Sequence, residues 1–191
     1  LKMRRSVLGE SHRETLNTWR NVARVVELQG RFEEALQEFL ALDRVLATGS
    51  KPEDRAPIAV QRAQVLLRLG RLREAETIAQ QSLKVARAGG PGEALNVTNA
   101  TFLLGRVALA RGDARAAAVL LAEVLKQREQ ILGPANPRLA EARGELGLAK
   151  LRSGEGAGAL IAAALPVLSG WGVYHPDDVR VLQTAVGRSS N

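Results

Sequence analysis

One glycine recurs along the sequence at nearly constant intervals and opens a similar short segment each time. Gly30 opens GRFEEAL, Gly70 opens GRLREAE, Gly112 opens GDARAAA and Gly154 opens GEGAGAL, so the intervals are 40, 42 and 42 residues. A period of this length is typical of arrays in which each unit is a small supersecondary element. Such a unit cannot bury its apolar face alone, and the spacing therefore predicts a stack of repeats.

Apolar residues on both sides of the first of these glycines fall at helical spacing. Intervals of three and four residues place side chains on one face of an α-helix. A glycine between two such stretches supplies the left-handed backbone conformation that ends the first helix. Each unit is therefore predicted to be a hairpin of two helices, and the chain an all-α solenoid. The stripes are Trp19, Val22, Ala23 and Val26 before Gly30, and Phe32, Ala35, Leu36, Phe39 and Leu42 after it.

Composition removes several classes of function. Aromatic residues make up only 3% of the 191 residues, so the β-rich classes are not favoured. No cysteine is present, which excludes disulfides, thiol catalysis and zinc–thiolate sites. The two histidines, His12 and His175, have no nucleophile pattern or cluster of partners beside them. We therefore expect no metal site, no cofactor and no enzyme activity.

The residues of the hairpins resemble a known repeat family. The pattern Trp19-x2-Val22-Ala23-x2-Val26, then Gly30, then Ala35-x3-Phe39 is similar to a tetratricopeptide repeat (TPR). The usual repeat has about 34 residues, so these units are about one turn longer in each helix. Linkers such as LGESHRETL and LGPANPRLA resemble the long, kinesin-light-chain-like type. The resemblance implies a right-handed α-solenoid, and the second unit departs from it most, because Arg62 occupies a normally apolar position.

The repeat period predicts one array over residues 1–191. LKMRRSVLG at 1–9 parallels LKQREQILG at 125–133, which indicates that residues 1–9 are the tail of a preceding repeat and that the chain is a fragment of a larger protein. Proline and two acids after His175 favour a helix start, and this helix is expected to cap the last hairpin. The predicted parts are a tail at 1–9, repeats at 13–48, 53–89, 93–132 and 137–172, and a capping helix at 176–188.

The segment GEGAGAL has a second interpretation, because it approaches the glycine pattern of dinucleotide-binding loops. Such a loop follows a strand and precedes a helix. The residues before Gly154, ELGLAKLRS, are instead in helix phase and equivalent to the helix before Gly112. In this alignment Gly156 and Gly158 replace residues equivalent to Phe32 and Glu34 of the first unit. The segment is therefore predicted to be a hairpin turn of an atypical terminal repeat.

Polar side chains on the first helix of each unit are the candidate binding residues. In a tetratricopeptide array these helices line a concave groove, and Arg24, Gln64 and Arg106 share one position in successive units. Arginine and amide groups bind carboxylates and peptide carbonyls, whereas a merely solvated helix face is the alternative. The predicted concave face consists of Asn17, Arg20, Asn21, Arg24, Gln61, Gln64, Arg68, Asn99, Phe102 and Arg106.

The sequence thus favours a non-catalytic module that binds a protein or an extended peptide of acidic or polar character. The resemblance implies a cytoplasmic setting beside bacterial signalling domains such as kinases. A nucleic-acid-binding solenoid is the alternative, favoured only by the net charge of +7. The basic residues are spread along the chain without a basic block. The apolar run at 157–173 is shorter than the roughly 20 residues of a bilayer-spanning helix, so no membrane span is expected.

Overall fold

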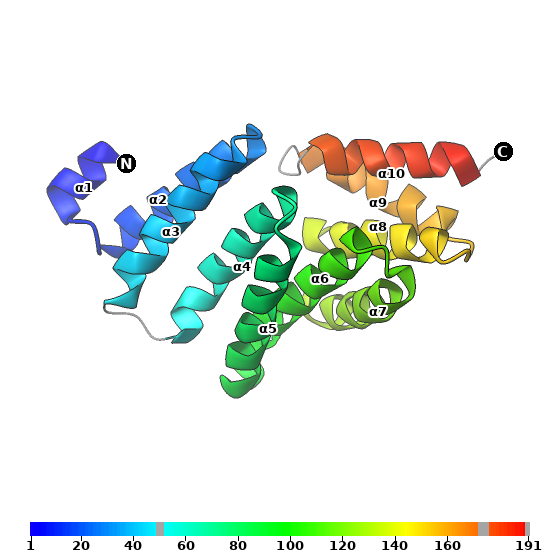
Figure 1. Ribbon diagram of the computed structural model, residues 1–191, viewed down its shortest axis with the longest axis horizontal. Helices are drawn as coiled ribbons and strands as arrows, with labels where there is room; N and C mark the ends of the chain where they lie inside the picture. The colour runs from blue at the N-terminus through cyan, green and yellow to red at the C-terminus, as the bar shows by residue number, and fades with distance from the viewer. Residues whose placement is uncertain (49–51, 172–175, 190–191) are drawn as a thin grey trace. The chain divides into compact units, whose positions relative to one another are not determined.

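A computed structural model describes residues 1–48, 52–171 and 176–189 (Figure 1). Within these ranges the chain forms ten α-helices and one short 3-10 helix, and no strand. The prediction of an all-α fold is confirmed. The chain divides into two compact units, Leu1–Ala100 and Thr101–Asn191, with the division inside one helix. That the repeats continue as one array through both units stays a prediction of the glycine spacing.

Unit 1 (Leu1–Ala100) contains consecutive helices that pack against their neighbours in chain order. Each longer helix contacts the next, so that α2 with α3 and α4 with α5 form two hairpins (Figure 1). The elements are α1 (Lys2–Leu8), α2 (Arg13–Leu28), α3 (Phe32–Ala47), α4 (Pro52–Arg68), α5 (Leu72–Ala88), the 3-10 helix η1 (Pro91–Glu93) and the start of α6 (Ala94–Ala110).

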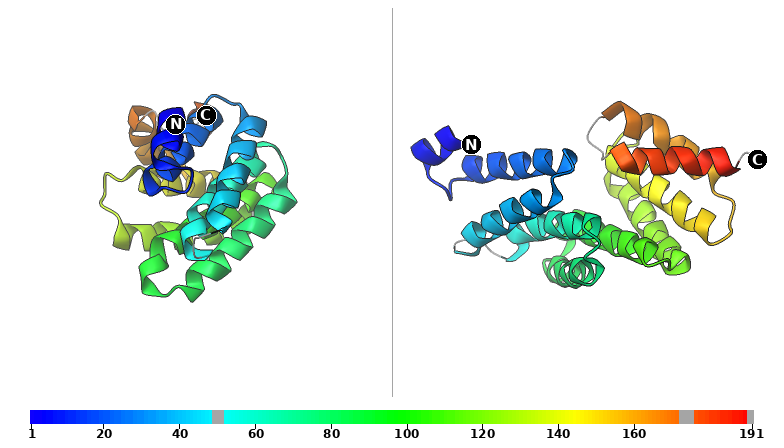
Figure 2. Two further views of the ribbon diagram at one scale, coloured as in Figure 1. Left: turned by 90° about the vertical axis from the view of Figure 1, so that its left-hand side faces the viewer. Right: turned by 45° about the horizontal axis from the view of Figure 1, so that its top comes forward.

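Unit 2 (Thr101–Asn191) follows the same plan and ends with an additional helix. Helices α8 and α9 form a hairpin, α7 packs on α8, and the last helix contacts both α9 and α8 (Figure 2). The elements are the rest of α6, then α7 (Ala114–Ile131), α8 (Pro137–Arg152), α9 (Gly158–Trp171) and α10 (Pro176–Ser189). His175 lies outside the described residues.

The four repeating glycines close the first helix of each hairpin in the same way. Gly30, Gly70, Gly112 and Gly154 have φ values of 78°, 72°, 85° and 86°, in the left-handed region. The amide of Gly30 donates to the carbonyl of Glu27, and that of Arg31 donates to Val26. This pattern of hydrogen bonds is the Schellman motif, in which glycine avoids the steric penalty of a Cβ atom. The same two bonds recur at the other three glycines.

GEGAGAL is therefore a hairpin turn, as predicted, because Gly154 follows a helix and makes the turn bonds of its three counterparts. Hydrogen bonds from Ser153 and then from Lys150 lower the pKa of the Glu155 carboxyl group in this turn. The predicted alignment of the following helix is wrong by two residues. Buried Ile161 stands seven residues after Gly154, whereas its counterpart Leu121 stands nine after Gly112.

The predicted core stripes are largely confirmed. Ala35, Leu36, Phe39 and Leu42 of α3 are buried, as are Trp19, Ala23 and Val26 of α2. Trp19 also donates its indole N–H to Glu38 Oε2 at 2.6 Å and carries the guanidinium of Arg5 over its ring at 3.9 Å.

Val22 does not belong to this core, because its side chain is 38% exposed. It lies on the side of α2 that also carries the exposed Val25. Helix α1 has only seven residues, and its polar contacts with α2 reach from Glu14 to Trp19. The periodicity placed Val22 correctly on a helix, but too little of the chain covers that side of α2.

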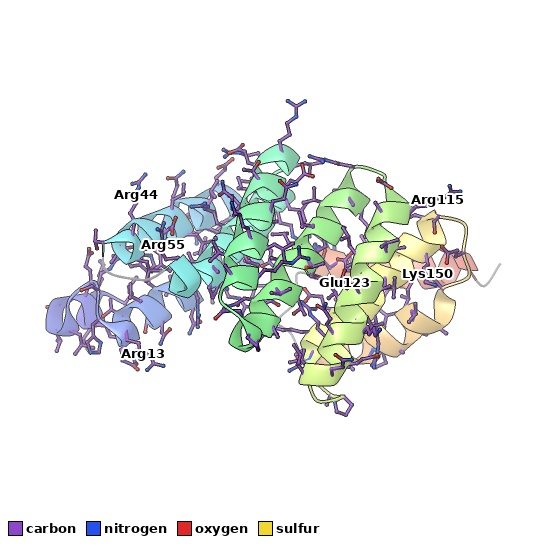
Figure 3. All side chains as sticks on the ribbon, turned by 90° about the horizontal axis from the view of Figure 1, so that it is seen from below. Arg13, Arg44, Arg55, Arg115, Glu123 and Lys150 are labelled. Atoms are coloured by element: carbon purple, nitrogen blue, oxygen red, sulfur yellow. The ribbon has the colours of Figure 1, made fainter. Side chains whose placement is uncertain are left out.

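Arg62, the departure from the apolar pattern in the second unit, is accommodated by an acid on the preceding helix. Asp43 of α3 accepts from Arg62 Nη1 at 2.8 Å through one oxygen and from Arg55 Nη2 at 2.9 Å through the other. Figure 3 shows Arg55 at the α3–α4 contact, whereas Arg44 of α3 is exposed. One carboxylate thus links two arginines of α4 to α3. Arg62 therefore stays packed against α3 although its side chain is not apolar.

Candidate functional site

The candidate residues on α2 form one polar stripe. Asn17, Asn21 and Arg24 follow at helical intervals, with Arg20 beside them, away from the buried Trp19 stripe. Asn21 and Arg24 are exposed, while Asn17 and Arg20 are half-buried. Within the described part of the chain, neither Arg20 nor Arg24 forms an ion pair. Their guanidinium groups therefore keep hydrogen-bond donors for another molecule.

The candidate residues on α4 form a second stripe of the same kind. Gln61, Gln64 and Arg68 are three and four residues apart on one helical face, and all three are half-buried. The Oε1 atom of Gln61 is buried and accepts no hydrogen bond from the described residues. A buried acceptor without a donor is uncommon in folded proteins. Asn99, on the part of α6 in unit 1, is half-buried as well.

Phe102 does not face the surface, contrary to its predicted role as an apolar contact for a ligand. Its side chain is only 1% exposed and belongs to the core of unit 2, among Leu109, Leu121 and Val124. The guanidinium of Arg128 lies 4.6 Å from the centroid of its ring. The repeat alignment predicts which side of the helix a residue faces only to within about one position. At Phe102 this uncertainty decides between the surface and the core, and the side chain lies in the core.

Arg106 is already engaged by two carboxylates of unit 2. Its Nε atom is 3.1 Å from Glu145 Oε1 on α8, and its Nη2 atom is 3.3 Å from Asp178 Oδ1 on α10. The side chain is mostly buried. Sequence reasoning missed both acids as partners of Arg106; the signal for one was the acidic first turn of the last helix. The row of Arg24, Gln64 and Arg106 joins residues of different units and stays a prediction.

Other kinds of site find no support in the described residues. No group of three metal-ligating side chains comes together within those ranges. No helix in the described part of the chain has both the length and the apolar character of a bilayer span. His12 accepts the backbone N–H of Glu14 with Nδ1 at 3.2 Å and thereby caps the start of α2.

Comparisons with known proteins agree with this geometry. The family model described as tetratricopeptide repeat matches residues 54–130. By sequence, no curated protein matches the chain. The crystal structure of nearly identical TPR-like repeats, from a Podosopora anserina protein assigned as a kinesin light chain, superposes with a TM-score of 0.57 at 20% identity. That match covers 98% of this chain and 84% of the other.

BtubC (BKLC) from P. vanneervenii superposes with a TM-score of 0.63, also at 20% identity, over 85% of this chain and 66% of that protein. Identities this low establish a shared fold, while the family model adds the repeat signature in the middle of the chain. The helix hairpins, the turn glycines and both comparisons agree. Residues 54–130 carry the tetratricopeptide repeat signature, and the fold of the chain is that of the TPR-like repeats in these two structures.

Proposed function

We propose that this chain is a non-catalytic protein-binding scaffold, and that the polar stripes of α2 and α4 in unit 1 bind an extended acidic or polar peptide. The tetratricopeptide fold is typical of protein-interaction scaffolds. A cytoplasmic setting within a larger signalling protein is part of this proposal, supported by the family resemblance alone.

The observation that carries the proposal is the state of Arg24. This arginine is exposed, lies one turn from the exposed amide of Asn21, and has no acidic partner among the described residues. Its counterpart by repeat position, Arg106, holds two carboxylates. The chain thus satisfies an arginine at this position with carboxylates in unit 2 and leaves the equivalent arginine of unit 1 open. A carboxylate on an extended peptide supplies the missing partner, and amide side chains beside it suit peptide carbonyls and N–H groups.

The test is a titration with a labelled octapeptide of alternating serine and glutamate. Arg24→Gln removes the charge without touching the core, and we expect the affinity to fall about tenfold, as for one charge-assisted hydrogen bond. Arg44→Gln is the matched control, because Arg44 is also an exposed arginine and lies on α3. Equal losses in the two variants would reduce the effect to net charge and remove the stripe as a site.

The same titration separates peptide binding from the nucleic-acid alternative. An octapeptide and a single-stranded oligonucleotide are each measured over a series of salt concentrations. Phosphate binding weakens with a slope set by the number of phosphates contacted. Tight oligonucleotide binding with a steep slope, together with no peptide binding, would replace the proposed function by the alternative.

A further inference from the structure

Helix α10 occupies a shaped apolar seat on unit 2. Leu182 and Ala185 are buried in a cluster with Ile161, Ala164 and Leu168 of α9. The seat extends onto α8 at Gly144, where a Cβ atom would stand 2.9 Å from Leu182 Cδ1. Because this glycine has no side chain, the leucine of α10 fits against the backbone of α8. Figure 2 shows α10 lying along α9.

One end of the seat carries a cation that holds an acid of α10. Arg106 on α6 binds Glu145 of α8 through Nε, at 3.1 Å, and Asp178 of α10 through Nη2, at 3.3 Å. Asp178, Leu182 and Ala185 are four and three residues apart, so they share one face of α10. The seat therefore binds two features of one helix, a carboxylate in the first turn and a leucine one turn later.

Few of the described side chains of α10 are buried. Leu182 and Ala185 are buried and Val179 is partly buried against the same cluster, whereas α8 has eight buried residues. Val181 and Arg180 of α10 are exposed. Local opening is easiest where few apolar contacts are buried, so α10 is the element of unit 2 suited to leave as a whole.

We propose that this seat, formed by Arg106, Gly144 and the apolar residues around Ile161, is a second binding site, distinct from the stripes of unit 1. Its ligand is an amphipathic helix of another protein with a carboxylate in the first turn and leucine four residues later. Helix-in-groove recognition uses such anchors at intervals of three and four residues. Helix α10 is the occupant supplied by the chain itself, and it excludes the partner helix until it is displaced.

The experiment uses the full chain and a labelled peptide with the sequence of α10, PDDVRVLQTAVGRS. In the wild-type chain the tethered α10 competes at an effective concentration of about millimolar, so the peptide binds weakly. Leu182→Asp in the chain weakens the tethered helix only, and we expect the peptide to bind at least about tenfold more tightly. Adding Gly144→Leu fills the seat and should abolish this gain, and adding Arg106→Gln should reverse most of it. A peptide carrying Leu182→Asp is the control and should not bind.

Helicity by circular dichroism checks that each variant folds. If Leu182→Asp disturbs the unit, Asp178→Asn replaces it, with an expected gain of about threefold. Hydrogen exchange gives an independent readout: amides of α10 should exchange well before those of α8. A folded variant that binds the peptide no better than the wild type, or equal exchange in the two helices, would make α10 a permanent cap and overturn the proposal. Concentration-dependent dimers of the wild type would assign the seat to a second copy instead.

Discussion

The same sequence element occurs once in each unit, and its two copies differ mainly in what covers them. LKMRRSVLG at 1–9 and LKQREQILG at 125–133 both end a helix, and each contains an arginine that reaches the carbonyl group ten residues later. Arg4 Nη1 donates to Glu14 O at 3.1 Å, and Arg128 Nη1 donates to Arg138 O at 2.6 Å. The local bonds are thus a property of the element itself.

The energy of these bonds is a property of the surroundings. The side chain of Arg4 is 46% exposed, whereas that of Arg128 is 2% exposed and lies against the ring of Phe102. A hydrogen bond or ion pair open to water contributes little, while removing one partner of a buried pair is costly. The comparison teaches that a repeat specifies geometry, and that the neighbouring hairpin decides how much each contact stabilises.

The largest expected difference between the two copies comes from replacing Arg128 and Arg4, each in its own variant. Arg128→Ala takes away the donor to Arg138 and the ion-pair partner of Glu141 and leaves a void against Phe102. We expect it to lower the free energy of unfolding by about 3–5 kcal/mol, as for a disrupted buried pair. Arg4→Ala should cost less than about 1 kcal/mol because its contacts are exposed. Urea denaturation followed by circular dichroism measures both, and similar losses would show that cover does not matter.

The position seven residues before each turn glycine sharpens the contrast between the units. Unit 1 has buried Ala23 and Ala63 there, and unit 2 has Gly105 and Gly147. A Cβ atom on Gly147 would meet Ile161 Cγ1 at 2.5 Å. Isoleucine has one strongly preferred side-chain conformation in a helix and cannot turn away easily.

Gly147→Ala should therefore cost about 1–2 kcal/mol, an overpacking penalty reduced by the better helix propensity of alanine. The reverse change in unit 1, Ala23→Gly, should cost about 1–2 kcal/mol, because it lowers helix propensity and removes a buried methyl group. Thermal unfolding of both variants checks the pair. A stabilised Gly147→Ala variant would mean that the second helix of its hairpin moves aside freely and that the close contact is not required.

Much of this could be predicted from the sequence because the repeat is marked by glycine and alanine. Gly30 and its counterparts are required by a positive φ, and Ala35 by close packing, so both types leave a periodic trace. The shift by two residues after Gly154 left no trace, because small residues in GEGAGAL mark neither face of a helix. The hairpin was predictable there, but its register was not.

The errors in the predicted buried and exposed faces have a common cause. Periodicity identifies a face of one helix, while exposure depends on what the next element places over it. Val22 was expected in the core and is exposed, whereas Phe102 was expected at the surface and is buried. The partners of Arg106 come from two other helices, one of them 72 residues away in the sequence, so no local pattern could indicate them.

The helix caps that follow the two copies provide a smaller test. His12 accepts the amide of Glu14 at 3.2 Å and Asn136 accepts that of Arg138 at 3.0 Å, in equivalent places. Asparagine is among the best capping residues, whereas histidine is not in the preferred set. Asn136→Ala should cost about 1 kcal/mol and His12→Ala about half of that, while His12→Asn should stabilise by a few tenths. A lower free energy of unfolding for His12→Asn would show that the imidazole ring stabilises the protein through contacts other than the cap hydrogen bond.

The smallest effect on stability is expected at an exposed position of unit 1 whose counterpart in unit 2 is buried. Val25 and Ala149 both stand five residues before a turn glycine, yet Val25 is 53% exposed and Ala149 is fully buried against the core of unit 2. Val25→Gln replaces an exposed apolar side chain on α2 with a better helix former, and we expect a change within about 0.5 kcal/mol in either direction. The measurement is the urea midpoint beside that of Ala149→Gln, which forces a polar group into the core and should unfold far earlier. A loss of more than about 1 kcal/mol from Val25→Gln would mean that this side of α2 is covered in solution. The matched variant Arg13→Gln, an exposed change at the start of the same helix, then separates burial of Val25 from a general weakness of α2.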